Sequence, residues 1–384
     1  MARPFNQCTV DCTALLLAKS HRAAVAMGVT IRLLPSAPLL CHPHGTPAWY
    51  TPVLYSIAVR EGDVARGGVT CAWRFLGQGQ SEPMWGGRLA QAGVPVAFLA
   101  RGDHLHALAR DGLRVDSPQG DFVVQPWLVT DDPTAVGIVD VVVVGVKTWQ
   151  LPEVAHALPA LVGPDTCVVP LQNGVEAPTQ LAHAVGAQAV LGGCCRVMSV
   201  RVAPGHIQHR GGIDPYLLVG ELDHRRSARV ERLCQVLQQA GVTAAIPPDI
   251  QVAMWEKFVQ VAAFSGVGAV TRAPVGILCT LPETRALLEQ VMQEIVAVAR
   301  AWHVALPADV IPTALAQLAS FPPGGTNSTQ RDLMAGRPSE LDAHAGAVVR
   351  LGHARGVPTP VNTFLYHSLL PLELHARGHL VFPL

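Results

Sequence analysis

The chain has 384 residues, a length that suggests two domains. Hydrophobic residues make up 49% of it and charged residues 15%, which fits a well-buried globular protein and excludes a disordered chain. The formal net charge is zero and no apolar run is long enough to span a membrane, so we expect neither a nucleic-acid nor a membrane partner.

The nine cysteines are odd in number and include no CxxC pair, which favours reduced thiols in a cytoplasmic protein. The apolar run 13–18 is short and no clear cleavage site follows it, so we do not expect a secretory signal. Cys8, Cys12, His42 and His44 lack the spacing of a standard zinc site. We therefore expect no metal.

The first 69 residues show no sustained periodicity and are rich in turn residues. We assign no fold to residues 1–69 and expect them to be an extension outside the native fold. From Thr70 the pattern alternates between strands and helices, which predicts a parallel sheet and a Rossmann-like domain over 70–248. The clearest strands are predicted at 94–100, 139–146 and 166–171, with helices at 104–110 and from Leu151 onward.

After Pro247 and Pro248 the strand patterns stop, and the remainder is helical. Helices are predicted over 250–264, 282–303, 307–319, 339–352 and 362–374. The predicted fold class is therefore α/β, with a Rossmann-like domain followed by an all-helical C-terminal domain over 249–384. We expect the ligand site in the cleft between them.

A damaged dinucleotide fingerprint follows the apolar residues 75–76. Gly77 and Gly79 have G-x-G spacing, but Glu82 stands where the third glycine or alanine is expected. A carboxylate there would face the pyrophosphate at a helix N-terminus. Either the segment is not a nucleotide site, or the site has been altered.

Lysine is scarce in this chain: only Lys19, Lys147 and Lys257 occur among its 28 basic residues. Lys147 follows the predicted strand 139–146, and Lys257 lies in the first helix after the domain boundary. Lysine can give up its proton near neutral pH, whereas arginine cannot. A functional role and an ordinary surface role for Lys147 and Lys257 are equally compatible with their position and scarcity.

Several segments together resemble the ketopantoate reductase (2-dehydropantoate 2-reductase) family. They are VGVKTWQ at 144–150, LQNGV at 171–175, WEKF at 255–258, Ser328 followed by GRPSELD at 336–342, and GVPTPVN at 356–362. The resemblance covers residues 71–384. It implies an NADPH-dependent enzyme of pantothenate biosynthesis, whose helical domain is similar to the C-terminal domain of 6-phosphogluconate dehydrogenase.

The resemblance also implies roles for individual residues. Lys257 would be the general acid that protonates the ketone oxygen, and Glu340 would hold Lys257 and the substrate hydroxyl in place. Asn173 would lie between the nicotinamide ribose and the substrate, Ser328 would bind the substrate carboxylate, and Lys147 would contact the cofactor or the substrate. A positioned ammonium suits this chemistry because hydride addition builds negative charge on the carbonyl oxygen.

The cofactor implied by the resemblance is NADPH, bound in part by Gly77 and Gly79. Arg101 directly follows the predicted strand 94–100, and an arginine at this position accommodates the 2′-phosphate of NADP. Family members often carry asparagines at two substrate-facing positions that are Val261 and Ser265 in this chain. The more apolar wall would favour a different or bulkier 2-oxo acid.

Two alternatives to ketopantoate reduction stay open. One is a reductase of another branched 2-oxo acid, and the other is a catalytically impaired relative whose fingerprint is broken at Glu82. The helical domain is also compatible with a homodimer. The intact set of Lys257, Glu340 and Asn173 favours an enzyme acting on a small 2-oxo acid.

The altered fingerprint suggests a hypothesis about the gene. Residues 70–83 can be back-translated so that another reading frame encodes a start codon, a strand and all three glycines of the fingerprint. We therefore hypothesise that residues 1–83 come from the wrong frame. If the chain is real as written, we expect Glu82 to weaken NADPH binding.

Overall fold

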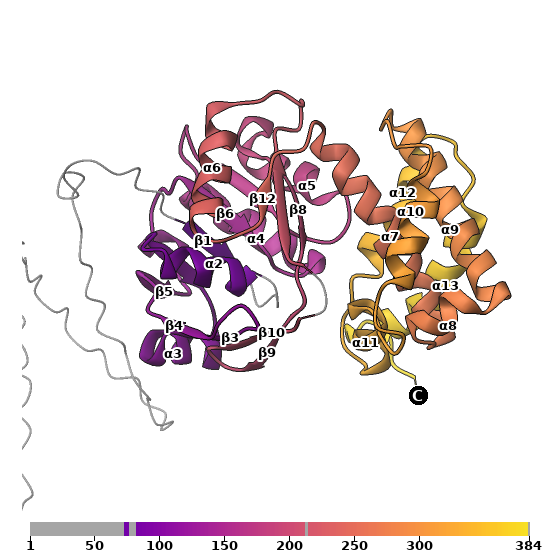
Figure 1. Ribbon diagram of the computed structural model, residues 1–384, viewed down its shortest axis with the longest axis horizontal. Helices are drawn as coiled ribbons and strands as arrows, with labels where there is room; N and C mark the ends of the chain where they lie inside the picture. Colours follow the sequence, from indigo (N-terminus) through magenta and orange to yellow (C-terminus); the bar gives the residue numbers. More distant parts are fainter. Residues whose placement is uncertain (1–72, 77–81, 212–213, 383–384) are drawn as a thin grey trace, which may run out of the picture. The chain divides into compact units, whose positions relative to one another are not determined.

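The computed structural model describes residues 73–76, 82–211 and 214–382 (Figure 1). All described residues belong to one compact unit, Val69–Leu384. The expected extension over 1–69, the glycines Gly77 and Gly79 and most of the segment in the reading-frame hypothesis lie outside the described residues.

A five-stranded parallel sheet forms the centre of the first half of the described chain. Its spatial order is β5-β2-β1-β6-β7, so the chain order reverses between β1 and β6, as in a Rossmann fold. The strands are β1 (Trp73–Leu76), β2 (Val96–Leu99), β5 (Leu128–Thr130), β6 (Val141–Val144) and β7 (Cys167–Pro170). All four valines of β6 are buried, which is typical of a parallel strand covered on both faces.

Helices connect these parallel strands. They are α2 (Glu82–Gln91), α3 (Gly102–Asp111), the 3₁₀ turn η2 (Thr148–Gln150), α4 (Leu151–Ala157) and α5 (Ala177–Val185). The α/β prediction with a helical C-terminal part is confirmed (Figure 1). Because the strands are parallel, the residues that follow β2, β6 and β7 lie at the same edge of the sheet.

Two smaller sheets extend this half and were not predicted. One has the order β4-β3-β10-β9 and the other β12-β11-β8. Their strands are β3 (Leu113–Asp116), β4 (Phe122–Val124), β8 (Gly192–Arg196), β9 (Ser199–Ala203), β10 (His206–His209), β11 (Tyr216–Gly220) and β12 (Ala244–Ala245), with helix α6 (Ala228–Gln239) before β12. Strands this short, one of them reading GGCCR, carry too little alternation to be recognised from sequence.

The second half is helical and is organised around α7 (Ile250–Thr271). The Asp249 carboxylate accepts hydrogen bonds from the backbone N–H groups of Gln251 and Val252, which caps this helix. Around α7 lie α8 (Val275–Thr280), α9 (Pro282–Ala301), α10 (Val310–Ala319), α11 (Ser328–Met334), the π-helical turn η5 (Asp342–Gly346), α12 (Ala347–Ala354) and α13 (Pro360–Ala376). The helix predicted over 339–352 thus begins only at Asp342, with a π-helical turn.

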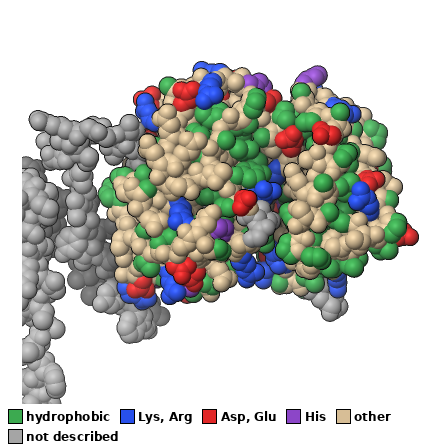
Figure 2. Space-filling view, viewed as in Figure 1, with side chains coloured by type: hydrophobic (Ala, Val, Ile, Leu, Met, Phe, Trp, Pro, Cys, Tyr) green, Lys and Arg blue, Asp and Glu red, His purple; other side chains and the backbone are tan. Residues whose placement is uncertain are grey.

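Apolar packing explains why α7 runs well beyond its predicted end at Phe264. Its second half is buried almost without interruption, and Phe258, Val259 and Val267 are among the least exposed side chains of the helical core. Burial of that kind contributes about 1.5–3 kcal/mol for each large apolar side chain. On the face seen in Figure 2, acidic and basic side chains are interspersed. No described helix is long and apolar enough to cross a membrane.

Candidate active site

The carboxyl ends of two neighbouring parallel strands supply one side of the candidate site. Lys147 follows β6 and Asn173 follows β7, and both side chains are half-buried. The side-chain amide of Gln172 donates to the carbonyls of Val144 and Val146, 3.0 and 3.1 Å away, and so ties the two strand ends together. These two hydrogen bonds fix the backbone positions of Lys147 and Asn173 at the edge of the sheet.

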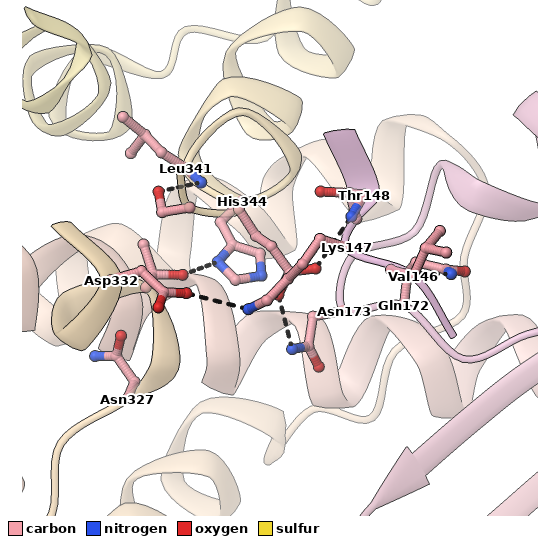
Figure 3. A network of polar contacts seen from close by, with 12 residues as sticks. Val146, Lys147, Thr148, Gln172, Asn173, Asn327, Asp332, Leu341 and His344 are labelled. Carbon is pink, nitrogen blue, oxygen red and sulfur yellow. Dashed lines mark hydrogen bonds and ion pairs between the residues drawn. The ribbon is translucent and has the colours of Figure 1, made fainter. Parts of the chain in front are cut away.

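The helical half supplies two carboxylates that reach these strand ends, and Figure 3 labels one of them, Asp332, beside Lys147. Glu340 is 5% exposed, and its Oε2 accepts from the Asn173 amide at 3.4 Å. Its Oε1 accepts from the backbone N–H of Thr148 at 3.4 Å. Glu340 therefore joins the two halves of the fold at the sheet edge.

Lys147 makes two ion pairs with the helical half. Its Nζ lies 3.1 Å from Oδ2 of Asp332 on α11 and 3.7 Å from Oε2 of Glu340. The Asp332 side chain is 13% exposed and also pairs with Arg337 at 2.9 Å. The Lys147 ammonium and the Arg337 guanidinium thus face two largely buried carboxylates, which limits the cost of burying them.

Lys257 enters the site from α7. Its Nζ donates a 2.6 Å hydrogen bond to the backbone carbonyl of Cys195 at the end of β8. Beside it lies a cavity of about 10 Å³, room for about one water molecule. The cavity is lined by Gln172, Asn173, Gly174, Gly193, Cys194, Met254, Lys257, Phe258 and Val261.

Apart from Lys257, the side of this small cavity that α7 forms is apolar. Met254, Phe258 and Val261 present hydrocarbon and thioether surface, and burial raises the pKa of the Cys194 thiol, which keeps it neutral. Val261 lies one helical turn after Lys257. Ser265 lies one turn further on; it is 2% exposed, and its hydroxyl has no hydrogen-bond partner among the described residues.

The structure therefore brings Lys257, Asn173 and Val261 to one cavity and connects Glu340 to it through Asn173. One detail differs from the expectation: the hydrogen bond of Lys257 goes to Cys195, while Glu340 binds Asn173 and Thr148. The geometric reason is that Glu340 lies at the residues that follow β6 and β7, whereas Lys257 projects toward β8.

Ser328 is the first residue of α11, and the Asn327 side chain caps this helix by accepting from the Gln330 N–H. The four-residue spacing places Ser328 on the same helix face as Asp332, which reaches Lys147. Asp332 is a site residue that sequence reasoning missed. The four-residue spacing between Ser328 and Asp332 is a sequence pattern from which this site residue could have been predicted.

His344 is a second residue that sequence reasoning missed. It is 1% exposed, its Nδ1 lies 3.2 Å from the Thr329 hydroxyl, and its Nε2 has no hydrogen-bond partner among the described residues. Burial lowers its pKa to about 4, while Glu340 acts in the opposite direction. The ring is therefore neutral at physiological pH, and no sequence pattern distinguished it from the other fifteen histidines.

Arg101 lies at the carboxyl end of β2 and precedes α3. Its guanidinium forms an ion pair with the carboxylate of Glu153 in the first turn of α4. Both side chains are more than half exposed. Arginine at this strand end suits a phosphate of a dinucleotide, as does Lys147 at the end of β6, so the described donors fit the expected cofactor.

A larger cavity of about 510 Å³ lies on the other side of the turn after β7. Asn173 and Gly174 form part of both cavities, but the larger one contains neither Lys257 nor Glu340. The smaller cavity is the one lined by Lys257, the residue expected to act as the general acid. Within the described residues no cluster of three or more metal-ligating side chains is found.

Comparison with known proteins defines the class. The ketopantoate reductase PanE/ApbA family profile matches residues 76–224, and the profile of its C-terminal domain matches residues 249–373. The chain therefore belongs to the ketopantoate reductase family, a family of oxidoreductases.

Individual proteins agree with this assignment. A 2-dehydropantoate 2-reductase from Nostoc is 30% identical over 78% of this chain and 95% of its own length. The crystal structure of a PanE/ApbA family ketopantoate reductase from Ralstonia eutropha has a TM-score of 0.73 at 31% identity, covering 80% of this chain and 99% of that one. A ternary structure of D-mandelate dehydrogenase with NADH shares the fold, with a TM-score of 0.72 at 21% identity, covering 80% and 99%.

Proposed function

We propose that this protein reduces 2-dehydropantoate to pantoate with NADPH, a reaction of pantothenate biosynthesis in the cytoplasm. The observation that carries the proposal is the convergence of Lys257 and Asn173 on one cavity, with Glu340 hydrogen-bonded to that Asn173. The names of the relatives at about 30% identity support the same reaction. We further propose that residues 70–248 bind the dinucleotide and that 249–384 supply the proton donor.

Lys257 is the proposed general acid. An ammonium has three N–H donors, and the hydrogen bond to Cys195 uses one of them while fixing the direction of the side chain. NADPH supplies the hydride that adds to the ketone carbon. The negative charge that then develops on the ketone oxygen is stabilised by the Lys257 ammonium, which gives that oxygen its proton.

Asn173 and Glu340 position the reacting groups. The Glu340 carboxylate holds the Asn173 amide, so the amide is oriented before a ligand arrives. Glu340 is also the proposed acceptor for the substrate hydroxyl, and Ser328 the proposed donor to the substrate carboxylate. The small cavity must open to admit a 2-oxo acid, and relative movement of the two halves around the Lys147–Asp332 contact would allow this.

Arg101 and Lys147 are the proposed cationic contacts of the cofactor. They lie at the carboxyl ends of β2 and β6, on either side of β1, where dinucleotides bind in folds of this topology. Gly77 and Gly79 are proposed to approach the pyrophosphate. A homodimer through the helical half is proposed as the oligomeric state.

A second candidate is the reduction of another branched 2-oxo acid. The observation that favours it is the apolar cavity wall, in which Val261 and Met254 offer no partner to a substrate hydroxyl. A buried hydroxyl without a partner costs about 1–3 kcal/mol, so an unhydroxylated substrate would bind better there.

One assay separates these functions. The purified chain is mixed with NADPH and either 2-dehydropantoate or a panel of branched and aromatic 2-oxo acids, and NADPH consumption is followed by absorbance. The highest kcat/KM with 2-dehydropantoate supports the first proposal, and a higher value with an unhydroxylated acid supports the second. No NADPH consumption with any acid would support a catalytically impaired relative.

A further inference from the structure

The ion pair between Arg101 and Glu153 joins the carboxyl end of β2 to the first turn of α4. We infer that Glu153 sets the preference between NADPH and NADH, because its carboxylate competes with the 2′-phosphate of NADPH for the Arg101 guanidinium. The inference rests on the proposed function, since it concerns the nucleotide that the reductase uses.

The position of the pair follows from the sheet order. Arg101 lies two residues after the end of β2, and Glu153 lies in the first turn of α4, the helix that follows β6. β2 and β6 are the two neighbours of β1. The pair therefore reaches across the end of β1, the place where the adenosine half of a dinucleotide lies in this topology.

The charges on the two nucleotides differ at this point. A phosphate monoester carries about −1.5 to −2 charges near neutral pH, whereas the ribose hydroxyl of NADH is uncharged. If Arg101 turns to the 2′-phosphate, it gives up its partner, and the Glu153 carboxylate then lies close to a second anion. Both effects weaken the binding of NADPH, and neither affects the binding of NADH.

An acidic side chain near the end of β2 also favours NADH directly, because a carboxylate accepts hydrogen bonds from the ribose hydroxyls. In this chain the acid that contacts the arginine comes from α4, while the strand end carries the arginine and Asp103 follows in the first turn of α3. Sequence position alone favours NADP through Arg101, with Asp103 as an opposing feature. The ion pair shows a site with one feature for each nucleotide, and so a smaller preference for NADPH than Arg101 alone would give.

Arg101 can leave Glu153 for another anion because both side chains are exposed, Arg101 to 63% and Glu153 to 57%. Exposed ion pairs are weak and are screened by salt. A change at Glu153 should therefore alter nucleotide binding with little effect on folding.

The test compares Glu153→Gln with the full-length wild-type chain. The control is Glu231→Gln, which removes the same charge from another exposed pair, formed at 2.7 Å between Arg226 and Glu231 of α6. Dissociation constants of NADPH and NADH are measured by fluorescence titration at low and high salt, together with each variant's melting temperature.

We expect Glu153→Gln to bind NADPH about three- to tenfold more tightly, to bind NADH equally or more weakly, and to lose most of the gain at high salt. Glu231→Gln should leave both constants unchanged. Equal changes for the two nucleotides, or none, would overturn the inference while leaving the reductase proposal intact. If the wild-type chain binds neither nucleotide, the proposed function itself fails. Glu153→Ala serves as a second variant should the glutamine variant melt at a lower temperature.

Discussion

The Lys257 ammonium lies 2.6 Å from the backbone carbonyl of Cys195, which accepts its hydrogen bond. A main-chain carbonyl is held by the β8–β11 pairing and cannot rotate away as a side chain can. The bond therefore fixes Lys257, the proposed proton donor, at the wall of the small cavity.

The first prediction concerns this donor. Lys257→Ala should lower kcat by roughly 10²–10⁴-fold, because general acid catalysis contributes about that much. Lys257→Arg keeps the positive charge but holds its proton, so it should also lose most of the activity. NADPH consumption under saturating substrate gives kcat for each variant. Wild-type turnover in the alanine variant would exclude Lys257 as the acid.

The second prediction concerns the carboxylate that holds Asn173. Glu340→Gln keeps the size of the side chain and removes its charge, while Lys147 keeps its ion pair with Asp332. We expect kcat/KM to fall about 10- to 100-fold, since a positioned charged hydrogen bond contributes about 1.5–3 kcal/mol. Steady-state kinetics measure this, and thermal melting shows whether the variant is folded. A folded variant with unchanged kinetics would contradict the role.

The third prediction concerns substrate choice. Val261→Asn adds an amide to the cavity wall one turn from Lys257. The ratio of kcat/KM for 2-dehydropantoate to that for the same acid without the hydroxyl should rise roughly 5- to 100-fold, the effect of about 1–3 kcal/mol. Val261→Leu, which stays apolar, is the control and should not raise the ratio. A ratio that does not change in the asparagine variant would show that the hydroxyl lies elsewhere.

The fourth prediction concerns acid stability. The pKa of His344 is lowered from its ordinary value of 6.5 to about 4 by burial. Between these pH values the unfolded chain binds a proton at this residue and the folded chain does not, so the free energy of unfolding falls as the pH decreases through this window. At a pH below about 4 the free energy of unfolding is lower by about 3 kcal/mol than at a pH above 6.5, as far as His344 contributes to it.

Urea unfolding at several pH values measures this slope. His344→Leu should make the free energy of unfolding less dependent on pH between about 6.5 and 4. Part of the dependence will remain, because burial also lowers the pKa of His104 to about 4. If the leucine variant has the wild-type slope, His344 does not carry the effect.

The fifth prediction concerns the start of α2. This helix begins at Glu82, where an anion-binding helix N-terminus would face a pyrophosphate. Glu82→Gly should lower the NADPH dissociation constant measurably, because it removes a like charge. An unchanged titration would count against this role. Resequencing the DNA upstream of codon 84 tests the reading-frame hypothesis, which an uninterrupted frame through that codon would exclude.

The sequence by itself determined the class of the fold. The run of valines in β6 and the long apolar helices around α7 are periodic over enough residues to be recognised. Short strands such as β8 and β12 were missed, because their pairing depends on contacts with residues far along the chain. The family motifs also identified Lys257, Asn173 and Glu340 as candidates.

Only the tertiary structure decided how these residues are connected. It gave Lys257 a main-chain partner, joined Lys147 to Asp332, and buried His344 beside the Glu340 network. It also brought Glu153 into an ion pair with Arg101. Local periodicity reports what one segment prefers, whereas an ion pair between residues 52 positions apart depends on the sheet order that brings them together.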